Sequence, residues 1–271
     1  MPAVVEPSCF AAWGFVKMQL VNAHYKIETQ LDGAGMLKRI EAIGRTCYQS
    51  DWMITEDSYI PFAHKLLERT HLSVIEHESV TVRLICDRGV SHEIVRHRLA
   101  SYAQESTRFC NYFKDRFGGE IKIIEPYFWT PGDGFYEEWL EAMKDAERHY
   151  MRLMEMKAKP EQARSVLPNS LKTEIVITMN LREWRWFFAL RTAKAAHPQI
   201  REVACPMLLE FRNNIPVLFD DPLCDADELK KYKAAMQGVI DTIPDDEIQE
   251  DAIFNICRAN GLELTSEQIA G

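Results

Sequence analysis

The chain has 271 residues, of which 46% are apolar and 27% are charged, so it is long enough for one well-filled globular domain. Its 41 acidic residues outnumber the 32 Lys and Arg and give a net charge of −9, which argues against a general duplex-DNA-binding protein. Only 12 glycines are present, and neither G-x-G-x-x-G nor G-x-x-x-x-G-K-[ST] occurs. Side chains, rather than a glycine-rich turn, would therefore have to hold any bound phosphate.

The seven cysteines are odd in number and widely spaced, and no C-x-x-C occurs. This pattern excludes a disulfide framework or a zinc ribbon and predicts a reducing, cytoplasmic location. The sequence has no long apolar run, so we predict neither a signal peptide nor a membrane span.

Hydrophobic periodicity predicts seven helices, in chain order over residues 32–48, 58–70, 91–99, 135–157, 160–167, 181–191 and 198–214. Ser91 is the predicted N-cap of the third helix. Strands are predicted over 79–86 and 171–179, the polar stretch 101–111 has no clear period, and 121–124 is a short apolar run. Helices and strands interleave without a regular βαβ rhythm, so we predict an α+β fold. This fold is one domain with a central, largely antiparallel sheet flanked by helices.

The composition changes after residue 215. Residues 220–251 hold eleven acidic residues and only three lysines. We therefore divide the chain into a main domain, residues 1–215, and an acidic, helical C-terminal extension, residues 216–271.

The segment from Arg96 to Arg108 has the highest density of functional side chains. It reads RHRLASYAQESTR and places three arginines, a histidine and several hydroxyls within thirteen residues. The planar fork of arginine binds phosphate through two parallel hydrogen bonds, and serines add short donors. A solvated basic face is the competing interpretation, and residue types alone do not separate the two.

Two further clusters combine polar side chains with apolar ones. Residues 70–77 place two histidines, a serine and a glutamate between a predicted helix and a predicted strand. This cluster has three possible interpretations: a metal site, a contact with an anion or cofactor, or the capped end of the helix. His92 and His97 are five residues apart, whereas the H-E-x-x-H zinc motif needs four, so we expect no metal. Residues 180–191 hold aromatic residues at core-like spacing together with three arginines, which packing explains less easily.

These residues resemble the flavin-dependent thymidylate synthase family. The family signature reads R-H-R-x-x-S-x-x-x-x-S-x-R. This sequence matches all six of its fixed positions between Arg96 and Arg108. H-x-S-x-x-E-H at 71–77 and N-L-R with A-L-R-T at 180–192 agree in order and spacing, so the likeness covers roughly residues 36–215.

The resemblance implies a reaction and its partners. The family converts dUMP to dTMP with methylenetetrahydrofolate as carbon donor, while NADPH reduces a tightly bound FAD. No enzyme cysteine is required, which agrees with the absence of a recognisable nucleophile. Similar proteins are homotetramers with shared active sites around a twisted sheet, and they bind neither nucleic acid nor membrane.

The resemblance also assigns residues. Those expected near FAD are His71, Ser73, Arg96, His97, Arg98, Gln104, Asn180 and Arg182. Those expected on dUMP are Glu93, Arg96, Gln104, Glu105, Ser106, Arg108, Arg164 and Arg191. Arg191 is expected to be catalytic, because a guanidinium on the uracil ring stabilises the charge that grows on its oxygens. Gln104 departs from the glutamate of some relatives, and Trp186 replaces smaller residues, so Trp186 receives no role.

An RNA-binding module is the alternative from another class. It would use the basic region 96–116 and stack bases on Tyr102, Phe109 and Tyr112. The overall acidity disfavours it, and a metal hydrolase ranks third because no ligand spacing fits.

Overall fold

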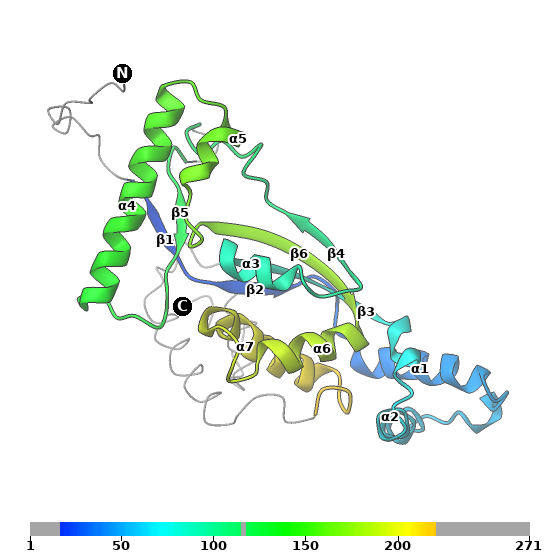
Figure 1. Cartoon of the computed structure of the whole chain (residues 1–271). Helices are drawn as coiled ribbons and strands as arrows, with labels where there is room; N and C mark the ends of the chain where they lie inside the picture. The colour runs from blue at the N-terminus through cyan, green and yellow to red at the C-terminus, as the bar shows by residue number, and fades with distance from the viewer. Residues whose placement is uncertain (1–16, 115–117, 221–271) are drawn as a thin grey trace, which may run out of the picture.

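The computed structural model describes residues 17–114 and 118–220 (Figure 1). Most of the predicted acidic extension, from residue 221 onward, lies outside this part of the chain. The strands are β1 (Gln19–Val21), β2 (His24–Ile27), β3 (Ser79–Asp87), β4 (Ala100–Gln104), β5 (Lys122–Ile124) and β6 (Lys172–Asn180). The helices are α1 (Gly33–Thr46), α2 (Tyr59–Glu68), α3 (Arg88–Ile94), α4 (Gly134–Glu155), α5 (Pro160–Ala163), α6 (Leu181–Arg191) and α7 (Pro198–Asn214). Short 3-10 turns are η2 (Asp51–Met53), η3 (Leu72–His77) and η5 (Arg164–Val166).

The central sheet has four strands in the order β2-β3-β6-β4, and every neighbouring pair is antiparallel. β3 and β6 pair over nine residues, from Ser79 opposite Asn180 to Asp87 opposite Lys172. β1 and β5 form a separate, parallel two-stranded sheet. The mixed fold with an antiparallel central sheet is therefore confirmed, and β4 is an edge strand of that sheet.

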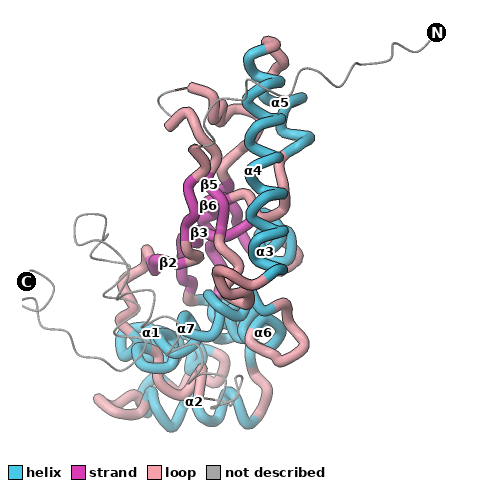
Figure 2. The backbone as a smooth tube through the Cα atoms, turned by 90° about the vertical axis from the view of Figure 1, so that its left-hand side faces the viewer, coloured by secondary structure: helices cyan, strands magenta, loops and turns pink. Residues whose placement is uncertain are grey.

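Most of the helices form two groups around the sheet. Figures 1 and 2 both place α1, α2, α6 and α7 together on one side of the central sheet and α4 and α5 on the other, and Figure 1 shows α4 beside β1 and β5. Two buried clusters match this division: the larger joins α6 and α7 to the central sheet, and the smaller lies between α4, α5 and β5.

Aromatic packing fixes α6 on the sheet. Trp184, Phe187 and Phe188 of α6 are fully buried and pack against one another, with ring centroids 5.3–5.7 Å apart. Trp184 and Phe188 also pack against Phe211 of α7, at 5.3 and 5.1 Å. The Trp184 indole donates a hydrogen bond to the backbone oxygen of Val80 in β3 at 3.0 Å. Aromatic burial of this extent supplies several kcal/mol, so α6 is a firm support for the side chains it carries.

Two local predictions are wrong. The helix expected over 91–99 runs over Arg88–Ile94, and Asp87, not Ser91, caps it by accepting the backbone N–H of Val90. The polar stretch 101–111 contains β4, which has only half-buried and exposed residues and so shows no apolar alternation.

The segment after α7 packs into the main cluster. Val217, Leu218 and Phe219 are buried there, although they follow the boundary placed at residue 215. That boundary remains a prediction. Within the described ranges, no helix is both long and apolar enough to cross a membrane. No group of three potential metal ligands occurs among the same residues.

Candidate active site

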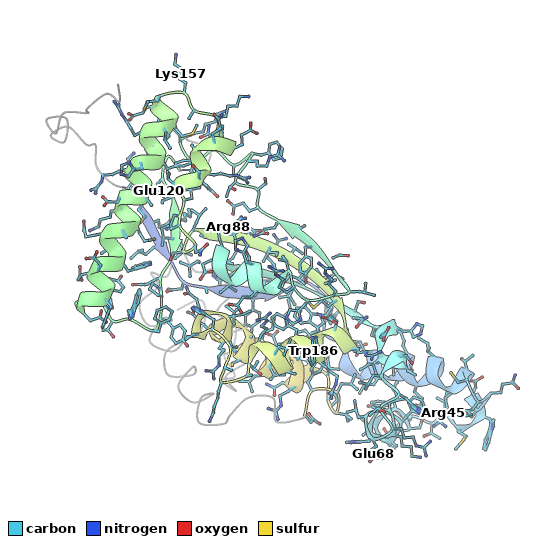
Figure 3. All side chains as sticks on the ribbon, viewed as in Figure 1. Arg45, Glu68, Arg88, Glu120, Lys157 and Trp186 are labelled. Carbon is cyan, nitrogen blue, oxygen red and sulfur yellow. The ribbon has the colours of Figure 1, made fainter. Side chains whose placement is uncertain are left out.

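The predicted site residues other than Arg96 and Arg98 fall into three groups. The α6 cluster consists of Glu93, His97 and Arg191, to which the structure adds Glu183. The η3 group is His71, Ser73, Asn180 and Arg182. The β4 loop group consists of residues 104–108 with Arg164. Figure 3 shows these elements with their side chains around the central sheet.

Arg191 is the centre of the α6 cluster. Its Nη1 donates to the Glu93 carboxylate at 2.7 Å, and its Nη2 donates to the Glu93 backbone oxygen at 3.0 Å. Its Nε donates to Nε2 of His97 at 3.0 Å. Three predicted site residues are thus brought together from the end of α3 and the end of α6, and the guanidinium is held on three sides.

His97 is buried between these groups. Only 3% of the residue is exposed, and its ring packs against Phe187 with centroids 5.0 Å apart. Burial, assisted by the positive charge of Arg191, lowers the pKa of His97 to about 4. The ring is therefore neutral at physiological pH.

The η3 group forms a polar corner where η3 meets the start of α6. Asn180 caps α6, because its side-chain oxygen accepts the backbone N–H of Glu183 at 2.8 Å. Arg182 donates to the carboxylate of Glu76 in η3 at 2.6 Å. His71 and Ser73 are exposed at the start of η3.

Arg96 and Arg98 are exposed on either side of buried His97, in the connection from α3 to β4. Neither forms a salt bridge with any residue that the structure describes. Two uncompensated guanidiniums beside a neutral polar corner suit an anionic ligand such as a phosphate.

The β4 loop group is also basic. Arg164 of η5 donates to the Thr107 hydroxyl at 3.2 Å, although the two residues are 57 positions apart. Ser106 accepts the backbone N–H of Arg108 at 3.3 Å, and Arg108 is exposed, 4.0 Å from the Glu161 carboxylate. The fold therefore places Arg164 beside the loop, and its contact with dUMP remains a prediction.

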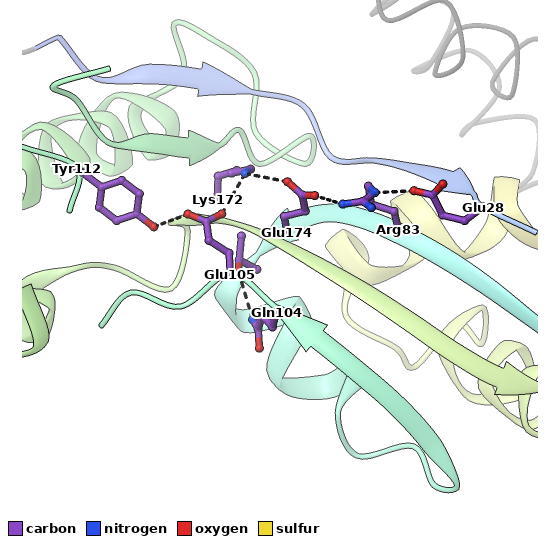
Figure 4. Close-up of polar contacts among 8 residues, drawn as sticks. Glu28, Arg83, Gln104, Glu105, Tyr112, Lys172 and Glu174 are labelled. Atoms are coloured by element: carbon purple, nitrogen blue, oxygen red, sulfur yellow. Dashed lines mark hydrogen bonds and ion pairs between the residues drawn. The ribbon is translucent and has the colours of Figure 1, made fainter. Parts of the chain in front are cut away.

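Gln104 and Glu105 are tied to neighbouring strands and helices (Figure 4). The Gln104 amide donates to Ser91 at 2.9 Å and to Thr173 at 3.3 Å. Glu105 accepts from the Tyr112 hydroxyl at 2.8 Å and from Lys172 at 3.0 Å, so both of its carboxylate oxygens are engaged. Their contacts with FAD or dUMP remain predictions.

The Glu105 contacts continue across the sheet. Lys172 also lies 3.8 Å from the Glu174 carboxylate, and Arg83 links Glu174 to Glu28 of the loop after β2. The sequence alone does not identify Lys172 as a site residue. Residues 105 and 172 become neighbours only because strands β4 and β6 pair in the sheet.

The aromatic residues of the RNA-binding alternative do not form a stacking platform. The Tyr102 hydroxyl lies 2.9 Å from the backbone oxygen of Ile94 and 2.7 Å from that of His97, and its single proton is shared between these two acceptors. Tyr112 is 7% exposed, whereas Phe109 is 72% exposed. One exposed ring of the three gives bases no continuous surface.

Comparison with known families decides the classification. The family model described as "Thymidylate synthase complementing protein" matches residues 31–217, which include all three groups. The chain belongs to this family. Membership confirms the resemblance that the Arg96–Arg108 motif indicates.

Curated flavin-dependent thymidylate synthases are similar in sequence to this chain. A flavin-dependent thymidylate synthase of Mycobacterium sp. (strain JLS) is 34% identical over 227 residues, which cover 74% of this chain and 87% of the relative. One of Pyrococcus abyssi (strain GE5 / Orsay) is 35% identical over 159 residues, which cover 58% of this chain. The match spans 64% of the length of that Pyrococcus relative.

Solved structures share the fold. The UMP/dUMP methylase PolB from Streptomyces cacaoi, bound with 5-Br dUMP, superposes with a TM-score of 0.60 at 22% identity, covering 74% of this chain and 95% of PolB. Thymidylate Synthase X from Helicobacter pylori, with FAD and dUMP, gives a TM-score of 0.58 at 22% identity, covering 74% of this chain and 99% of that one.

Proposed function

We propose that the chain is a flavin-dependent thymidylate synthase. It converts dUMP to dTMP with FAD as cofactor, methylenetetrahydrofolate as carbon donor and NADPH as reductant. The observation that carries the proposal is the α6 cluster, in which Arg191 is held by Glu93 and His97 inside the region matched by the family. The names of the curated relatives and the FAD and dUMP bound to the Helicobacter pylori protein support it.

The residues present suit FAD. Arg96 and Arg98 offer uncompensated positive charge for a pyrophosphate, and His71, Ser73, Asn180 and Arg182 supply polar contacts nearby. FAD, when bound, supplies the redox chemistry, while the protein orients the reactants. A cofactor held by arginines agrees with a sequence that lacks a glycine-rich phosphate loop.

Arg191 acts on the pyrimidine. A guanidinium carries five N–H groups, and three are used on Glu93 and His97, which leaves two for the oxygens of a uracil ring. Negative charge grows on those oxygens as carbon 5 becomes nucleophilic. A guanidinium that is already oriented stabilises this charge without reorganising, in the manner of an oxyanion hole.

The β4 loop group binds the phosphate of dUMP in this proposal. Ser106, Arg108 and Arg164 lie around Thr107 and combine a hydroxyl with two guanidiniums. We further propose a cytoplasmic homotetramer whose subunits share their active sites, without contact to nucleic acid or membrane.

Replacing Arg191 tests the proposal. The wild-type holoenzyme should show flavin absorbance, oxidise NADPH faster when dUMP is present, and form dTMP. Arg191→Ala should keep the flavin but lose at least about 100-fold in kcat for dTMP formation, since one charge-stabilising donor group is removed. Arg152→Ala, an exposed arginine of α4, is the matched control and should retain wild-type turnover.

Either of two results would contradict the proposal. A wild-type protein that acquires no flavin absorbance from added FAD would exclude the cofactor. Near-normal turnover by Arg191→Ala would exclude the role of the guanidinium.

A further inference from the structure

One face of α6 is built around the His97 ring. Glu183, Phe187 and Arg191 are spaced four residues apart and therefore lie along one face of the helix. Phe187 packs on the ring, Arg191 donates to its Nε2, and the Glu183 carboxylate lies 3.4 Å from its Nδ1. Neither the signature motif nor the resemblance gives Glu183 a role.

The contact with Arg191 determines which ring nitrogen of His97 carries the proton. A guanidinium can only donate, so Nε2 must offer a lone pair to the Nε–H of Arg191. A neutral imidazole has one N–H, and that proton is then on Nδ1. Nδ1 lies 3.4 Å from Oε1 of Glu183, an approach that is not a formed hydrogen bond. Both atoms are buried, and neither has a hydrogen-bond partner among residues 17–114 and 118–220.

Glu183 is held in place for this contact. Its side chain is 12% exposed, and that of His97 is 1% exposed, so water does not compete freely. The Glu183 carboxyl also accepts the backbone N–H of Arg98, and Arg182 is the neighbouring positive charge. One carboxyl group therefore contacts two consecutive residues of the Arg96–Arg98 segment.

We propose that Glu183 is a positioning residue that keeps His97 in the Nδ1–H tautomer and thereby fixes the guanidinium of Arg191. Were the proton on Nε2, two N–H groups would face each other, and Arg191 would lose one of its three anchors. The effect on turnover rests on the proposed function, whereas the tautomer does not. Second-layer partners of this kind orient functional histidines in many sites.

The test measures the tautomer and turnover separately. Glu183→Leu removes the acceptor, and Glu183→Gln keeps an acceptor while removing the charge. Glu137→Leu is the matched control, because Glu137 lies in the first turn of α4 and also accepts a backbone N–H. The protein is labelled with 15N in its imidazoles, and the His97 signals are those missing from His97→Gln.

The wild-type spectrum should show His97 as the Nδ1–H tautomer, and Glu183→Gln should retain it. Glu183→Leu should shift His97 toward Nε2–H and lower kcat at least about tenfold, with the KM for dUMP changed by less than about threefold and the flavin retained. Glu183→Gln and Glu137→Leu should stay within about threefold of wild-type kcat.

Two results would overturn the proposal: an Nε2–H tautomer in the wild type, or a Glu183→Leu variant whose His97 stays Nδ1–H. A shifted tautomer with unchanged kcat would overturn the link to Arg191 and leave only the effect of Glu183 on the His97 tautomer. A wild type that makes no dTMP but shows the Nδ1–H tautomer would sink the proposed function while sustaining the role of Glu183 toward His97.

Discussion

At the scale of single residues, the site depends on polar groups that satisfy one another. The motif positions predict Glu93, His97 and Arg191 one by one, but not that they meet. Their contact joins positions 94 and 98 residues apart in the sequence. Glu183 was missed because a glutamate in the first turn of a helix is ordinary, since it complements the helix dipole. The spacing of four to Phe187 and eight to Arg191 is the signal that points to it.

Glu202 of α7 is a residue whose ionised form destabilises the folded state. Burial, assisted by the carboxylates of Asp87 and Glu125, raises the pKa of Glu202 to about 8. The unfolded chain has the ordinary lower pKa, so the folded state binds the proton more tightly. Stability is therefore lost as pH rises from about 4.5 to about 8.

We expect Glu202→Gln to be more stable than wild type above about pH 8, by about 1–3 kcal/mol, and to show little gain near pH 5. Urea unfolding at both pH values measures this difference. Glu155→Gln, an exposed substitution on α4, should gain nothing at either pH. An equal gain for Glu202→Gln at both pH values would contradict the stated cause.

At the scale of elements, the sequence predicts the helices and strands that bury one face, because their apolar residues recur at a regular spacing. β6 alternates strictly between buried and half-buried residues, and β3 does so from Val80 to Cys86. α6 begins at Leu181 and ends at Arg191, as expected from its periodicity. β4 was missed because an edge strand without buried residues carries no alternation. The predicted start of α3 is wrong because Asp87 and Ser91, four positions apart, are both good capping residues. Only the structure shows that Asp87 accepts the backbone N–H of Val90 and caps the helix.

The attachment of α6 to the sheet predicts a contrast between two tryptophans. Trp184 is fully buried and donates to Val80, whereas Trp186 is 55% exposed. Trp184→Ala should lower the free energy of unfolding by about 3–5 kcal/mol, because it leaves a cavity and an unpaired carbonyl.

Trp186→Ala should change the free energy of unfolding by less than about 0.5 kcal/mol. Denaturant unfolding of both variants provides the comparison. An equal loss of unfolding free energy in the two variants would contradict the exposure of Trp186.

At the scale of the whole molecule, the three groups share one scaffold. The η3 group lies at the start of α6, the α6 cluster runs along one face of α6 from Glu183 to Arg191, and the β4 loop group follows the edge strand. Composition alone suggested a division at residue 215, because acidity begins soon afterwards. Burial of Leu218 and Phe219 shows that charge patterning and packing need not change at the same residue.

Two truncated chains test whether the packed domain ends at residue 215 or continues to residue 220. A chain ending at Asp220 keeps every buried residue of the main cluster that lies within the described part of the chain, and we expect it to retain the thermal stability of the full chain. A chain ending at Ile215 loses Leu218 and Phe219 from the core, at a cost of about 3–6 kcal/mol, and should melt at a clearly lower temperature. Thermal unfolding of both forms is the measurement, and indistinguishable melting would place the boundary at residue 215 after all.

The four-residue spacing of Glu183, Phe187 and Arg191 along α6 limits which sequence changes this helix can accept during evolution. An α-helix turns about 100° per residue, so inserting or deleting one residue between Glu183 and Arg191 would rotate one of them away from His97. Substitutions on the exposed side, where Trp186 lies, leave that alignment intact. In a set of descendants, α6 should therefore vary freely in the composition of its outer face and hardly at all in its length.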